Sequence, residues 1–161
     1  MMAKWQEAMT PGEHHAWLAE MAGEWSYTNT SYMDPSAEPE VTQGKSVIKV
    51  VLGGRYLEEV HTGTSFGMPF EGHQTTGFDN ISGKYRTNWY DNFGTGFMIG
   101  EGTREGNVLT IHASYPDFDG GTQKFRMVTT VQDKDNHTFE MFMVTPDGKE
   151  FRNMEIVYKR K

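Results

Sequence analysis

Apolar and polar residues alternate along most of the chain from about Thr42 onward. Such alternation is typical of β-strands that bury one face. Clusters of Gly, Asn, Asp and Pro interrupt it at spacings of roughly 10 to 16 residues, which suits long strands joined by tight turns. With the segment that starts near Trp25, the pattern predicts about ten strands. We expect an all-β fold, a closed antiparallel up-and-down β-barrel, because closure leaves no strand edge exposed.

One short α-helix is predicted before the barrel, over about residues 11–22. The run Thr10-Pro11-Gly12-Glu13 has the pattern of a capping box with proline at the first helical position, and Gly23 ends the helix. Trp17, Leu18 and Met21 share one side, so that side is expected to be buried as a plug over one barrel end. The barrel then covers about residues 23–160, and the chain, residues 1–161, is expected to form a single domain.

A turn at Gly53-Gly54 predicts the pairing of the two strands around it. Ile48 would lie opposite Glu59, and Lys49 opposite Glu58 as an exposed ion pair. The inward residues are then Ile48, Val50, Leu52 and Leu57 and, by strict alternation, Glu59 and His61. An inward carboxylate needs hydrogen bonds or water, so this pattern predicts a polar spot inside the barrel.

The next two turns extend this register. A turn centred near Gly67 would place His61 opposite His73, and one centred near Ile81 would place His73 opposite Trp89 and Glu71 opposite Asp91. His61, His73 and Trp89 would then share one inward face, with Glu59 and Asp91 close by. An error of one residue in either loop would reverse the face of the strand that follows.

The remaining strands predict an interior that is mostly apolar and aromatic. Inward positions are Tyr27 on the first strand and, on later strands, Leu109, Ile111, Tyr115, Phe125, Met127, Val131, Phe139, Met141, Met143, Met154, Ile156 and Tyr158. An apolar lumen with a few polar groups is the general make-up of a small-molecule pocket.

The composition of the chain limits the classes of partner that the protein is expected to bind. Fifteen Lys and Arg stand against 22 Asp and Glu, a net charge of −7, so nucleic acid is not an expected partner. The absence of Cys excludes disulfides, thiolate metal sites and thiol nucleophiles. No apolar run suggests a secretion signal or a membrane span, so we expect a cytoplasmic protein, either a monomer or a homodimer.

Several sequence runs resemble known families. Gly23-Glu24-Trp25 after a helix, with the tail Tyr158-Lys159-Arg160-Lys161, resembles the calycins, which include lipocalins and fatty-acid-binding proteins. This resemblance implies that Trp25 plugs one barrel end and that Arg160 stacks over it. Further matching runs are Leu52 to Glu59, Gly67 to Gly72, Gly77 to Asn80, Trp89 to Asp91 and Pro146 to Phe151.

Together these runs resemble the bacterial family of domain of unknown function 1579, over nearly the whole chain. The resemblance implies a calycin-like barrel. It assigns no activity and no catalytic residue.

We therefore predict non-covalent binding of a small apolar or amphipathic molecule in the lumen, without a cofactor. Apolar contact would come from Tyr27, Trp89, Met141 and Tyr158, and orientation from Glu59, His61, His73 and Asp91. An alternative is an acid–base enzyme, an isomerase or lyase, because Glu59 in an apolar lumen would have a raised pKa and His61 titrates near neutrality. A second alternative is a metal site built from His61, His73 and Glu59.

Overall fold

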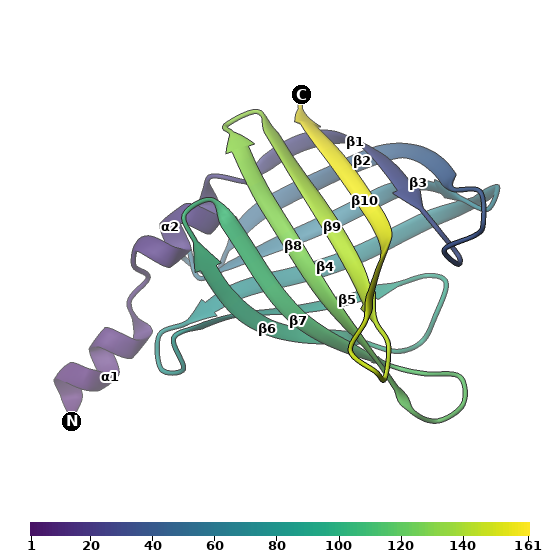
Figure 1. Cartoon of the computed structure of the whole chain (residues 1–161). Coiled ribbons are helices and arrows are strands. Elements are labelled where there is room, and N and C mark those ends of the chain that lie inside the picture. The colour runs from purple at the N-terminus through teal and green to yellow at the C-terminus, as the bar shows by residue number, and fades with distance from the viewer.

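The computed structural model describes residues 1–161. Ten strands form a closed barrel in which every strand pairs antiparallel with its neighbours in sequence, and β1 closes the ring against β10 (Figure 1). The predicted up-and-down barrel is therefore confirmed. The strands are β1 (Gly23–Ser31), β2 (Glu40–Val51), β3 (Tyr56–Ser65), β4 (Met68–Asp79), β5 (Lys84–Asp91), β6 (Met98–Glu105), β7 (Val108–Pro116), β8 (Thr122–Asp133), β9 (Asn136–Val144) and β10 (Glu150–Arg160).

The two ends of the barrel sequence meet at Trp25 and Arg160, as expected. The two residues are paired across β1 and β10, and the Arg160 guanidinium carbon lies 4.2 Å from the centre of the Trp25 ring. The guanidinium also donates to the carbonyls of Ala22 at 2.6 Å and Glu20 at 2.9 Å. A cation over an aromatic face combined with charged hydrogen bonds fixes the chain where it enters the barrel.

Two short helices precede the barrel instead of one. α1 (Met2–Met9) has no buried residue and projects from the barrel, with its last turn held by hydrogen bonds from Arg55 and Asn80, whereas α2 (Glu13–Ala19) lies against the barrel end (Figure 1). The predicted capping box at Thr10 is wrong: α2 begins after Gly12, whose N–H donates to Nδ1 of His15 at 3.0 Å. The expected plug is present, because Leu18 and Met21 are buried.

The predicted β2–β3 register is confirmed. Ile48 pairs with Glu59, and Lys49 with Glu58. Leu52 is not inward, however, because it lies in the turn with a φ of 50° and is 70% exposed. Val50, near the end of β2, is 39% exposed.

The next two registers each differ by one residue from the prediction. His61 pairs with Gly72, not His73, and Trp89 pairs with Gln74. The β3–β4 turn consists of Phe66 and Gly67, which both adopt positive φ and so form a two-residue turn. The two errors have opposite signs and cancel, so Trp89 on β5 faces inward as predicted. In β4, which lies between the two turns, the inward and outward residues are the reverse of the prediction.

Glycines let two inward aromatic rings lie flat on the barrel wall. A Cβ at Gly44 would collide with the Tyr27 hydroxyl, and one at Gly72 would collide with the Trp89 ring. Both rings therefore depend on the missing side chain of a neighbouring strand. Neither helix is long and apolar enough to cross a membrane.

Candidate functional site

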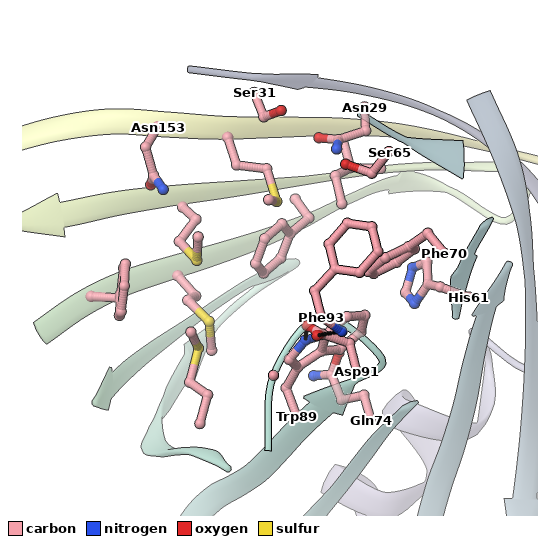
Figure 2. A pocket seen from close by; sticks show the side chains of 18 of the residues that line it. Asn29, Ser31, His61, Ser65, Phe70, Gln74, Trp89, Asp91, Phe93 and Asn153 are labelled. Atoms are coloured by element: carbon pink, nitrogen blue, oxygen red, sulfur yellow. Dashed lines mark hydrogen bonds between the residues drawn. The ribbon is translucent and has the colours of Figure 1, made fainter. Parts of the chain in front are cut away.

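A cavity of about 490 Å³ occupies the barrel at the end opposite α2 (Figure 2). Eighteen of its 30 lining residues are hydrophobic, so its wall is mainly apolar. Met33, Phe66 and Phe118 line the cavity and are also exposed on loops between strands. The cavity therefore opens to solvent between these loops. A second, smaller cavity of about 60 Å³ lies at the α2 end, lined in part by Leu18, Met21 and Glu59.

A hydrogen-bonded polar cluster lies between the two cavities. Ser46 donates to Oε1 of Glu59 at 2.6 Å, and Nε2 of His61 lies 3.3 Å from the same oxygen and 2.8 Å from the Tyr158 hydroxyl. Strand alternation brings these residues from β2, β3 and β10 to one interior spot. Of these residues, Glu59 lines the small cavity, His61 lines the large one, and Tyr158 lines both. Glu59 thus contacts His61 from the side of the small cavity.

Burial sets the ionisation of this cluster. Burial lowers the pKa of His61 below its ordinary value, against the opposing effect of Glu59. Burial also raises the pKa of Tyr158 well above its ordinary value, and Glu59 and Tyr27 add to that rise. Both effects favour the uncharged form. At neutral pH the imidazole and the phenol are therefore neutral.

Three aromatic side chains and one carboxylate lie together on one side of the cavity. Trp89 and Asp91 lie on β5, Phe70 on β4 and Phe93 on the loop after β5. The Trp89 ring stacks on Phe70 at a centroid distance of 6.2 Å, and Phe70 meets Phe93 edge to face at 5.5 Å. Asp91 accepts from Nε1 of Trp89 at 2.8 Å and from the N–H of Phe93 at 2.9 Å. Figure 2 shows these four residues together on one side of the cavity.

The wall formed by β1 and β10 carries polar side chains. Asn29 and Asn153 line the cavity, and their side-chain oxygens are buried without a hydrogen-bond partner. Figure 2 places both near this wall, with Ser31 and Ser65 close to Asn29. Unsatisfied acceptors of this kind are rare in folded proteins and identify positions where a bound molecule could donate.

The model of the family described as "Protein of unknown function (DUF1579)" matches residues 10–160. The chain belongs to this family. A search of the curated proteins found no match.

Two solved structures have the same fold as this DUF1579 chain. The crystal structure of Rv2717c from M. tuberculosis is 14% identical, covers 94% of this chain and 99% of its own, and has a TM-score of 0.65. The structure of EF1p2_mFAP2b bound to DFHBI is 14% identical, covers 92% of this chain and 100% of its own, and has a TM-score of 0.52. At these identities the likeness establishes the fold alone.

Six of the eight side chains predicted for the site line the large cavity of the DUF1579 barrel. These six are Tyr27, His61, Trp89, Asp91, Met141 and Tyr158. The seventh, Glu59, is inward but contacts the smaller cavity.

The inward placement of His73 is wrong. His73 lies on the outer surface, where its Nε2 is 2.7 Å from Oε1 of Glu71 and its ring stacks on Tyr90. His61 and His73 therefore point to opposite faces of the barrel wall. The metal set of His61, His73 and Glu59 cannot form, and no group of three or more His, Asp or Glu residues in the structure is arranged to hold a metal ion.

The sequence reasoning missed Phe70, Phe93, Asn29 and Asn153. Asn29 and Phe70 follow directly from alternation once Tyr27 and the corrected β4 register are used. Asn153 faces inward because β10 has a bulge between Arg152 and Met154, which regular alternation does not predict. Phe93 had a signal in the sequence, since Asp91 two residues earlier is a common start for a turn of this kind.

Proposed function

We propose that this DUF1579 protein binds a small, largely apolar molecule non-covalently in the cavity opposite α2. The observation that carries this proposal is the cavity itself. Its volume of about 490 Å³ lies within the range of ligand pockets, roughly 300–1,000 Å³. A barrel of related fold, EF1p2_mFAP2b, was solved bound to DFHBI, which is consistent with a ligand inside such a barrel.

The contacts proposed for the ligand divide by chemistry. Tyr27, Trp89, Met141 and Tyr158 would supply apolar surface, and methionines adapt to irregular ligand shapes. His61 and Asp91 would orient the polar part of the ligand, with Glu59 positioning His61. A calycin relationship is also part of this proposal, and it is supported by the Trp25–Arg160 contact.

The test is titration with Nile red, an uncharged apolar dye, followed by its own fluorescence. Met141→Trp should reduce the affinity at least about tenfold, because the indole fills space that the ligand needs. Phe142→Trp is the matched control: it is the next residue of β9, on the outer face under Arg126. Affinity that is the same in both variants, or no saturable binding to the unaltered protein, would contradict the proposal.

The contact between Glu59 and His61 favours acid–base catalysis on a bound molecule as a second candidate. A carboxylate 3.3 Å from Nε2 of His61 can orient the ring, as in catalytic dyads. Glu59→Gln would then abolish turnover of the substrate and leave folding intact. Simple binding predicts an altered affinity only.

A further inference from the structure

The charged groups in and around the large cavity are mainly acidic. Among its 30 lining residues Asp91 is the only acidic residue, and there is no Lys or Arg. The one other titratable group with a charged form near neutral pH is His61, and burial lowers its pKa and keeps it neutral. A carboxylate or phosphate ligand would therefore find no cation to pair with in the cavity, and desolvation without a partner is costly.

The loops around the open end of the barrel also carry a net negative charge. The five loops that connect strands at this end carry five carboxylates and one Lys: Asp34, Glu38, Asp117, Asp119, Asp147 and Lys149. The four turns at the α2 end instead carry two basic residues and one acidic residue: Arg55, Lys134 and Asp135. An acidic entrance raises the local concentration of cations and repels anions.

Asp91 is placed to act as a counter-ion inside the cavity. Each of its oxygens accepts one hydrogen bond, from Trp89 and from Phe93, and each carboxylate oxygen can accept a second. The rings of Phe70, Trp89 and Phe93, which contact one another, lie on the same side of the cavity as Asp91 (Figure 2), and Trp89 presents its N–H edge to the carboxylate. Aromatic faces beside a carboxylate are the usual environment for a bound ammonium group, because ring faces attract cations.

We infer that the ligand of this cavity is a cationic amphipathic molecule, an amine whose ammonium group lies between Asp91 and the rings of Phe70, Trp89 and Phe93 and whose apolar part extends along the methionine-rich wall. This inference rests on the proposed function and names the chemical class of its ligand. The neutral state of His61 matters here, since a protonated imidazole in the same cavity would repel the cation.

Three matched probes test the inference by isothermal titration calorimetry at neutral pH. They are 1-naphthylmethylamine, which is a cation, 1-naphthalenemethanol, which is its neutral isostere, and 1-naphthoate, which is an anion. The amine should bind about tenfold more tightly than the alcohol, because a partly desolvated ion pair contributes roughly that much. The naphthoate should bind more weakly than the alcohol.

Two isosteric variants locate the preference. Asp91→Asn should reduce the preference for the amine over the alcohol to within about twofold. Asp119→Asn is the control, because Asp119 is an exposed carboxylate on an entrance loop, where screening makes its contribution small. The preference should persist in this variant. Binding of Nile red, which has no ammonium or hydroxyl group, reports whether the Asp91 variant keeps its cavity.

Each outcome decides the inference. Equal or tighter binding of the alcohol or the naphthoate to the unaltered protein overturns it, and so does a preference for the amine that survives Asp91→Asn. In both cases the proposed function stands if Met141→Trp still weakens the binding. If no probe binds and Nile red also fails to bind, the proposed function fails and the inference fails with it. If the Asp91 variant does not fold, the ranking of the three probes on the unaltered protein decides.

Discussion

His137 should make the stability of the barrel fall as the pH drops below the ordinary pKa of histidine. The residue lies on β9 and is 4% exposed. Its ring stacks on Tyr158 at 4.2 Å and receives the edge of Trp25 at 4.4 Å. Nδ1 is buried without a partner. Burial, with smaller contributions from Arg160 and His61, lowers the pKa of His137 from 6.5 to about 4.

The sign and size of the effect follow from proton linkage. The unfolded chain binds a proton at His137 as the pH falls through 6.5, whereas the folded chain does so only near pH 4. His137 therefore leaves the unfolding free energy unaffected above about pH 6.5. Below that pH it lowers the unfolding free energy by about 1.4 kcal/mol per pH unit, down to about pH 4. A difference of 2.5 between 6.5 and 4 corresponds to about 3 kcal/mol in all.

His137→Phe isolates this contribution. Phe keeps the stacking on Tyr158 and cannot titrate, and the neighbouring cavity of about 60 Å³ gives room for the larger ring. At neutral pH the variant should lie within about 1.5 kcal/mol of the unaltered protein. The difference in unfolding free energy, unaltered protein minus variant, should fall by about 2–3 kcal/mol between about pH 6.5 and about pH 4.5.

Urea unfolding at several pH values, followed by far-UV circular dichroism, measures this difference. The subtraction removes the contributions of the carboxylates, which titrate in both proteins. His112→Gln is the control for loss of a histidine, because His112 is exposed on the outer face of β7, and the loss of stability due to His137 should persist in this variant. Parallel stability curves for the unaltered protein and His137→Phe would refute the reasoning.

Two further predictions concern how the barrel is closed and how its wall is shaped. Arg160→Ala should lower the unfolding free energy by about 2–4 kcal/mol, because charged hydrogen bonds and the contact with Trp25 are lost. Arg160→Lys should recover less than half of this free energy. Thermal unfolding measures both variants, and full recovery with Lys would contradict the role of the guanidinium in donating to two carbonyls. Gly44→Ala should cost about 1–3 kcal/mol, because its methyl group collides with the Tyr27 ring and with the backbone carbonyl of Thr62. In urea unfolding the double variant with Tyr27→Leu should recover only the part of this loss that is due to the ring, and strictly additive losses would contradict the collision with Tyr27.

Much of the fold could be predicted because the physical signals for it are local. Alternation and turn residues predicted ten strands, and Gly53-Gly54 predicted the β2–β3 register through to Glu59. The turn between β3 and β4 could not be read correctly, because Phe66, a bulky residue, adopts a positive φ that its residue type disfavours. Tertiary pairing of the two strands overrides that local preference.

The site was predictable only in part, because a face assignment accumulates error from strand to strand. Trp89 and Asp91 were placed inside through two mistakes that cancelled, so their correct placement owes nothing to His73, which lies outside. Asn153 faces the cavity because of a bulge whose position depends on the pairing of β10 with β9. Glu59 was identified as an inward polar group, but only the packed structure separates its cavity from that of His61.

The most direct test of ligand binding in the cavity is a nuclear magnetic resonance titration of protein labelled with ¹³C at the methionine methyl groups. Met127, Met141 and Met154 are three of the five methionines that line the cavity, whereas Met2 and Met9 lie on α1, away from it. With Nile red as ligand, the three cavity methyl resonances should shift and show contacts to the dye, while the two α1 resonances stay in place. Unchanged cavity methyl resonances at a dye concentration that saturates its fluorescence, or shifts confined to α1, would contradict the account.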